Sequence, residues 1–576
     1  MAGPTCRCTV GSRLLRPFPL YSCLRPMQSF RQFRRLRETV KTGHSQRPAD
    51  QDVEPNAPIG GAQTIPGQGE SLSEKHILVE WDGPDDPLNP RNWSHGRRFA
   101  AFCIVWINVF ALDYASGADS QASSRISKAF HVGEEAETLS PTLYTFGIAL
   151  GSLFAGPISE TVGRNPVYVV SRILHVAWLL GAALSPNFGA QCAFRFLAGL
   201  GGSTLLCIHG ASVADMYNPI ERTWAWPLMS LASFAGTALT PTISAWIAQA
   251  SITWRMDDWV ALIISGATLF LSVFLMPETF SPVLLSWKAK HLRETTGNPN
   301  YVSYQDLQPS LGARLKTALL RAWHMLVKEP IVVLMGLWLI AVYIVVYGFL
   351  QGFSFIFGDT YDLATGLKGT CFLAIVVGFV LWLCLVPIYY RLYKKEVLRL
   401  EHENGDDYIP DLKHVPGYDI PEPEYRIWPA VIVAPAFPIC LFWLGYTNRP
   451  DISIWSSLGA VTLFGFCWAG IYVVVVPDGH ANSFPDGIYA GSALAIITCF
   501  RYTFSGAINL ISRPMYNGLT VQWTMTMLGC IAAVLAPAPF FFFWKGPQIR
   551  LKSRFAGRYA RPVYERKQTG RALSWS

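Results

Sequence analysis

The chain contains few charged residues for its length. Of its 576 residues, 15% are Asp, Glu, Lys or Arg and 51% are hydrophobic, and its mean hydropathy is +0.26. Soluble domains carry about 25% charged residues. Most of this chain must therefore be surrounded by lipid, which excludes an ordinary soluble enzyme or a soluble binding domain.

Motifs for soluble catalysis and for ATP-driven transport are also missing. The sequence has no G-x(4)-G-K-[ST] phosphate loop, which argues against a primary pump. The Cys6-Arg7-Cys8 pair has no second pair at zinc-site spacing, and nine of the twelve cysteines fall in apolar stretches, where Cys acts as a small apolar residue. We expect no enzyme activity, no metal site and no cofactor.

Long apolar runs, by contrast, are abundant. A membrane-spanning helix needs about 20 apolar residues, and twelve segments of this kind are predicted. They lie near 99–119, 138–157, 165–185, 190–214, 224–248, 257–276, 330–353, 366–390, 427–446, 453–477, 487–510 and 522–544. The expected fold is an all-α multi-pass membrane protein in two six-helix halves. Its expected parts are a disordered cytoplasmic tail (1–95), one half (96–276), a central cytoplasmic linker (277–329), the other half (330–544) and a basic tail (545–576).

The formal charge of +8 is concentrated in the two tails, in the central linker and before the ninth span. An even number of spans puts both termini on one side, and the positive-inside rule makes that side cytoplasmic. The basic surplus thus indicates topology and contact with anionic lipid headgroups, not nucleic acid. Residues 1–45 are rich in Arg and resemble a mitochondrial presequence; a disordered basic tail and an over-extended start codon are the alternatives.

A short charged segment separates the second and third spans, and it reads Gly156-Pro-Ile-Ser-Glu160-Thr-Val-Gly163-Arg164. Gly156 and Gly163 permit close helix approach and a sharp turn. Glu160 and Arg164 have opposite charges and are close enough to pair. The pattern G-x-x-x-[DE]-x-x-G-[RK] resembles the loop between the second and third helices of the major facilitator superfamily. That resemblance implies a charged lock at the inner gate.

Further stretches resemble the fungal twelve-span drug:proton antiporters, which include multidrug, polyamine and secondary-metabolite efflux pumps. They are Asn89-Pro90-Arg91-Asn92-Trp93-Ser94, Arg195-Phe-Leu-Ala-Gly199-Leu-Gly-Gly202, Trp254-Arg255 and Met276-Pro277-Glu278-Thr279-Phe280-Ser281-Pro282. The antiporter signature G-P-x-x-G-P is reduced here to one Gly and one Pro, in Ala235-Gly236-Thr237-Ala238-Leu239-Thr240-Pro241. The coupling mode is therefore left open by the residues.

Asp113 lies in the middle of the first predicted span. A charged carboxylate at that depth costs at least about 2.5–3.5 kcal/mol, so we predict that Asp113 carries a proton across the membrane. The alternative is a wet position near Asp119. By resemblance, Arg195 lies near the proton-carrying acid and biases its protonation; the alternative is that Arg195 extends to the cytoplasmic interface.

Arg501 falls inside the eleventh predicted span, beside Tyr502. An Arg facing the cavity would attract an anionic or carbonyl-rich substrate, or pair with Asp113 across the halves. Aromatic residues of the seventh and tenth spans are predicted to line the same cavity: Trp338, Tyr343, Tyr347, Trp468 and Tyr472. Ser483 and Pro485 are predicted to begin the eleventh helix, whose positive end would face Glu160.

These observations predict a secondary active exporter that moves a hydrophobic or amphipathic small molecule out of a fungal cell by proton antiport and alternating access. We expect a monomer in the plasma membrane, with the vacuolar membrane as the alternative. A polyamine exporter and a non-transporting nutrient sensor with the same fold are the other functions to consider.

Overall fold

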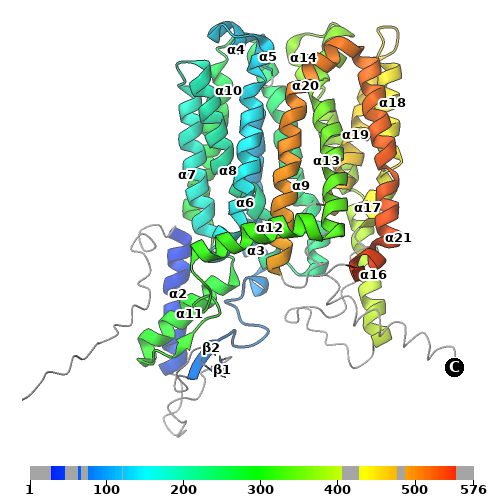
Figure 1. Ribbon diagram of the computed structural model, residues 1–576. Coiled ribbons are helices and arrows are strands. Elements are labelled where there is room, and N and C mark those ends of the chain that lie inside the picture. The colour runs from blue at the N-terminus through cyan, green and yellow to red at the C-terminus, as the bar shows by residue number, and fades with distance from the viewer. Residues whose placement is uncertain are drawn as a thin grey trace, which may run out of the picture.

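Two bundles of long helices stand side by side in the computed structural model, which describes residues 27–45, 62–66, 75–119, 121–404, 427–475 and 487–552 (Figure 1). The first bundle contains six long helices: α3 (His95–Ser116), α6 (Leu139–Val162), α7 (Arg164–Ala183), α8 (Phe188–Met216), α9 (Pro219–Gln249) and α10 (Arg255–Leu275). The short helices α4 (Ser123–Phe130) and α5 (Glu134–Glu137) connect α3 to α6. The predicted all-α membrane fold is confirmed.

The helices of the second bundle are interrupted more often. It contains α13 (Pro330–Gln351) with the π-helical turn η2 (Ser354–Asp359), then α14 (Thr365–Thr370), α15 (Leu373–Leu383), α16 (Val386–Asn404), α17 (Trp428–Val433), α18 (Ala436–Thr447), α19 (Ile454–Val475), α20 (Gly487–Leu535) and α21 (Pro537–Lys552). The breaks between α14, α15 and α16, and between α17 and α18, fall inside the eighth and ninth predicted spans.

Eleven helical stretches among the described residues are long and apolar enough to cross a membrane. The last of them, Ser492–Gly546, has 55 residues and would measure about 80 Å as one straight helix, whereas the hydrocarbon core is about 30 Å thick. Thr520 has φ 63° and ψ 163° and interrupts the helix, and the chain turns back there (Figure 1). This stretch therefore contains the eleventh and twelfth predicted crossings.

Glycines let helix backbones touch within each bundle. A Cβ on Gly147 of α6 would lie 2.2 Å from the carbonyl oxygen of Phe196, and one on Gly199 of α8 would lie 2.0 Å from that of Tyr144. In the second bundle, a Cβ on Gly378 of α15 would lie 2.0 Å from the carbonyl oxygen of Thr462 in α19. Small residues at helix contacts are the usual basis of packing in lipid, where water does not drive association.

The amino-terminal segment is ordered where it is described. Helix α2 (Met27–Ser45) packs on α11 (Ser281–Thr296) of the linker, and strand β2 (Lys75–Val79) pairs with β1 (Ala62–Pro66) and, in parallel, with β3 (Tyr301–Val302). We call α2, α11 and these three strands the amino-terminal cap. It lies at one end of the first bundle (Figure 1).

The expectation that 1–95 is disordered is therefore wrong for the helix and strands of this cap. Leu36 and Val40 of α2 share a core with Ile77 of β2 and Trp287 of α11. The buried surface comes from the linker, which the composition of the tail alone does not reveal. Residues 1–26, including Cys6, Cys8 and Cys23, lie outside the described part of the chain.

The central linker also contributes α12 (Leu311–Lys328), which runs across the same end of both bundles (Figure 1). Just before it, the side-chain amide of Gln305 donates to the carbonyl oxygens of Glu160 and Thr161, at 2.8 and 3.0 Å. The linker is thus attached to the last turn of α6.

Candidate transport site

Asp113 lies on α3, three residues before the helix ends at Ser116, and its relative exposure is 6%. Its carboxylate accepts a hydrogen bond from the hydroxyl of Ser233, near the middle of α9. Asp113 is thus nearer one end of its helix than predicted, but it is buried, and the wet position near Asp119 is wrong. A buried carboxylate with a hydroxyl donor is chemically able to exist with or without its proton.

Arg501 of α20 faces the same region from the second bundle. Its guanidinium lies over the rings of Tyr343 and Tyr502, 4.5 and 4.9 Å from their centroids, and its exposure is 3%. Tyr347 stacks beside Tyr343, with ring centroids 6.0 Å apart. A cation in contact with aromatic faces in a desolvated site is stabilised by the ring quadrupoles.

Ser233 connects the two bundles at this point. The phenol of Tyr472, on α19, also interacts with Ser233, and the Tyr472 ring lies 5.3 Å from that of Phe234. Asp113 and Arg501 interact electrostatically, but the guanidinium stacks on tyrosines instead of forming the direct ion pair that was considered from sequence. The two charges therefore interact across the halves without forming a direct ion pair.

Only some of the aromatic residues that were predicted to line the cavity lie near Asp113 and Arg501. Trp468 joins the group, because its ring lies 4.2 Å from that of Phe234. Trp338 does not, because its ring contacts Phe542 of α21, 6.2 Å away. The prediction for Trp338 was wrong because hydropathy does not tell which side of α13 faces the partner bundle.

Arg195 has partners that were not expected. It is fully buried, its guanidinium pairs with Asp119 and with Asp258 (2.9 Å), and Nη1 donates to the carbonyl oxygen of Ala115 at 2.7 Å. Asp113 is not among these partners, so the predicted position beside the proton-carrying acid is wrong for Asp113, and an extension to the cytoplasmic interface is wrong as well. Asp119, one of the partners of Arg195, comes just before α4, and α4 and α5 lie at the end of the bundle opposite α12 (Figure 1). The roles of Asp119 and Asp258 as partners of Arg195 were not predicted, because an acidic residue near the end of a span is usually expected to be hydrated.

The loop between α6 and α7 is organised by Glu278, which follows the last turn of α10. The Glu278 carboxylate accepts hydrogen bonds from the backbone N–H groups of Arg164 (3.0 Å) and Asn165 (3.2 Å), and from Thr279 (3.0 Å) and Phe280 (2.9 Å). Burial raises the pKa of Glu278 to about 7, although these donors favour the ionised form. The main chain of Glu278 in turn exchanges two hydrogen bonds with the amide of Gln32 in α2.

Within the same loop, Gly163 has φ 105°, and a Cβ there would lie 2.7 Å from a carboxylate oxygen of Glu278. The sharp turn predicted at Gly163 is confirmed. Gly156 is different, because a Cβ there would meet nothing within 4 Å, so it is not a site of close helix approach.

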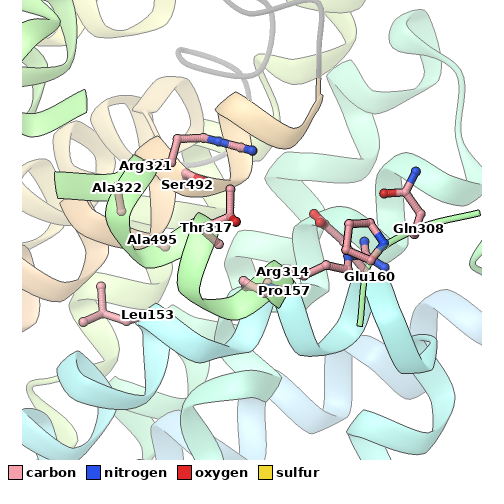
Figure 2. Close-up of a pocket in the computed structure, with 13 residues that line it drawn as sticks. Leu153, Pro157, Glu160, Gln308, Arg314, Thr317, Arg321, Ala322, Ser492 and Ala495 are labelled. Carbon is pink, nitrogen blue, oxygen red and sulfur yellow. The ribbon is translucent and has the colours of Figure 1, made fainter. Parts of the chain in front are cut away.

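The described residues show no direct ion pair between Glu160 and Arg164, although the two charges interact electrostatically as predicted. Arg164 Nε lies 3.1 Å from Asp215 of α8, and Nη1 donates to the hydroxyl of Ser159 at 2.6 Å. Glu160 instead lines a pocket with Arg314 and Arg321 of α12 (Figure 2). Ser483 and Pro485 lie outside the described residues.

Two bundles of long membrane-spanning helices that meet at a buried carboxylate and a buried guanidinium are the arrangement expected of a membrane transporter. The sequence matches the Major Facilitator Superfamily over residues 99–510, and the chain belongs to that family.

Fungal transporters are among the curated relatives of this chain. The MFS-type transporter kojT of Aspergillus oryzae is 38% identical over 580 residues, covering 92% of this chain and all of the relative. The multidrug transporter FLU1 of Candida albicans is 30% identical, over 91% of this chain and 83% of its own length. The efflux pump MFS2 of Trichophyton rubrum is 31% identical, over 88% and 82%. The chain is thus a multi-pass transporter of a fungal type that includes efflux pumps.

Among solved structures, the proton:xylose symporter XylE superposes with a TM-score of 0.54 at 16% identity. The match covers 79% of this chain and 96% of XylE. At this identity the likeness supports the fold and carries no information on the substrate.

Proposed function

We propose that this transporter exports a hydrophobic or amphipathic small molecule in exchange for protons. The observation that carries the proposal is the arrangement of Asp113 and Arg501. A buried carboxylate of one half interacts, through Ser233, with Tyr472 of the other half, and electrostatically with a buried guanidinium. A proton acceptor and a substrate-attracting group are therefore linked within one site.

The chemistry follows from competition for the Asp113 carboxylate. When Asp113 is ionised, it accepts a hydrogen bond from Ser233 and can accept another from a donor group of the substrate, while Arg501 attracts a carbonyl or anionic group. When Asp113 takes up a proton, this acceptor is lost and the substrate is released. Proton and substrate therefore exclude each other at this site, which is the negative coupling that exchange requires.

The lining favours a particular substrate class. Tyr343, Tyr347, Tyr472 and Trp468 offer large apolar faces with few polar atoms, which suits an amphipathic molecule. The Arg501 charge favours a carbonyl-rich or anionic group and disfavours a polyamine. The name of the Trichophyton relative, an efflux pump, supports export as the direction.

We also propose that the protein acts in the plasma membrane with both termini in the cytoplasm. Basic residues in the linker and before the ninth span support that orientation. A carboxy-terminal fluorescent tag is expected to outline the cell edge, and vacuolar or mitochondrial fluorescence would contradict this location.

The direct test uses the full-length protein in proteoliposomes with an imposed pH gradient. A panel of fluorescent amphipathic compounds, anionic, neutral and cationic, is offered with the gradient in either direction. We expect accumulation of neutral and anionic members against their own gradient on the side of higher proton concentration. Transport that ignores the pH gradient would contradict antiport, and the absence of any flux would favour a sensor.

A further inference from the structure

A pocket of about 140 Å³ lies where the central linker meets both halves (Figure 2). Glu160 and Pro157 of α6 form one wall, Arg314 and Arg321 of α12 cover it, and Ser492 of α20 closes the opposite side. It lies at the end of the bundles where α12 runs, away from Asp113 and Arg501. The transport site does not account for it.

Two features of the lining indicate an occupant. Nη1 of Arg314 is buried and has no hydrogen-bond partner among the described residues, and a buried unpaired donor is destabilising, more so when it is charged. Gly156 also lines the pocket, and a Cβ there would point into open space. Helix packing does not require this glycine, so its effect here is to leave room.

Charge sets the chemistry of the occupant. Glu160 interacts electrostatically with Arg314 and Arg321, as well as with Arg164 and Asp215, but Nη1 of Arg314 is left without a hydrogen bond among the described residues. Arginine forms its strongest hydrogen bonds with carboxylate and phosphate oxygens. Apolar side chains complete the walls, among them Leu153 and Ala495, which suits an anionic group attached to a short apolar part.

We propose that this pocket binds a small carboxylate- or phosphate-bearing molecule, supplied either by a lipid headgroup or by a free anion. The occupant contacts α6 of one half and α20 of the other. It therefore stabilises the state in which the halves are together at this end, and it slows the cycle that separates them.

The test measures binding to the full-length protein in nanodiscs by its melting temperature. One arm adds inorganic phosphate or hexanoate to discs of neutral phosphatidylcholine, and the other replaces part of that lipid by phosphatidic acid. Arg314→Gln removes the orphan donor, and Gly156→Leu fills the space. Lys316→Gln is the matched control, an exposed basic residue of the same helix outside the pocket lining.

We expect a saturable rise in melting temperature that Lys316→Gln retains, while Arg314→Gln weakens binding at least roughly tenfold and Gly156→Leu abolishes it. A response in the soluble arm identifies a free anion, and a response only to phosphatidic acid identifies a headgroup. The effective probe should also slow transport by the wild type and not by Arg314→Gln. No saturable response in either arm, or equal responses in all variants, would overturn the proposal; equal inhibition of both proteins would overturn the effect on the cycle.

Discussion

Arg164 pairs with Asp215 across 3.1 Å, and both side chains are largely buried at the end of the first bundle. The pair joins the start of α7 to the last turn of α8, so it holds the α6–α7 loop against a helix of its own half. Glu160, four residues before Arg164, is left to face α12. The charged loop therefore has two separate attachments, one within its half and one toward the linker.

Arg164→Ala is expected to cut transport severely while the protein still reaches the membrane. Removing one partner of a buried pair costs about 3–5 kcal/mol, and Asp215→Asn should have a similar effect. Because the two side chains form one unit, the double variant should be little worse than either single variant. Initial rates in proteoliposomes, normalised to protein content, measure this, and normal efflux by Arg164→Ala would contradict the gate role.

Asp113→Asn should abolish uphill, pH-driven transport, because the amide keeps the shape and the contact with Ser233 but cannot carry a proton. Exchange of substrate down its own gradient is expected to survive. Ser233→Ala, which leaves the carboxyl in place, should shift the pH dependence of transport without abolishing it. Uphill transport by Asp113→Asn with unchanged pH dependence would rule out Asp113 as the carrier.

Gly163→Ala and Gly156→Ala form a matched pair, with Gly156 inside α6 and Gly163 at the turn that follows this helix. At Gly163 the positive φ costs an L-residue about 1–2 kcal/mol, and the added Cβ meets the Glu278 carboxylate. At Gly156 the Cβ meets open space, and Ala is a better helix former than Gly by about 1 kcal/mol. Relative to the wild type, the melting temperature should fall for Gly163→Ala and should stay the same or rise for Gly156→Ala. The same melting temperature for both variants would contradict the turn assigned to Gly163.

Stability should depend on pH through Glu278. Its pKa is raised from 4.5 to about 7 by burial, so the folded protein holds this proton more tightly than the unfolded chain. The Glu278 contribution to the free energy of unfolding should therefore decrease as pH rises from about 4.5 to 7 and stay constant above 7. Glu278→Gln lacks this proton, so the difference in melting temperature between it and the wild type should change only in that window.

Deleting residues 1–45 should lower the melting temperature, because the apolar surface of Trp287 and Leu292 on α11 would become exposed. Deleting 1–26 retains α2 and is the matched control. Leu36→Ala, which removes one buried side chain of α2, should destabilise the cap by about 2–5 kcal/mol. If the longer deletion melts like the shorter one, the cap contributes nothing to stability.

The bundle architecture could be predicted from sequence because lipid imposes both the length and the composition of a span. The turn at Gly163 could be predicted because few residues tolerate that backbone conformation. Arg501 beside Tyr502 was recognised because a charge in the middle of an apolar run is costly.

The partners of the charged residues could not be predicted. Whether Arg164 meets Glu160 or Asp215, and whether Arg195 meets Asp113 or Asp258, depends on how each helix is rotated about its axis. Packing between helices sets that rotation, and hydropathy contains little of it. The cap was missed for a related reason, since Leu36 finds its core with Trp287, far away in the chain.

The attachment of Gln305 to the end of α6 limits how far the two halves can move apart during transport. Five residues, 306 to 310, separate that anchor from α12, and α12 leads through a single residue, Glu329, into α13 of the other half. Fully stretched, five residues span roughly 17 Å. The short segment 306–310 therefore limits the distance between the two halves at this end. While Gln305 stays bound to α6, the halves can separate there only by the length of this segment.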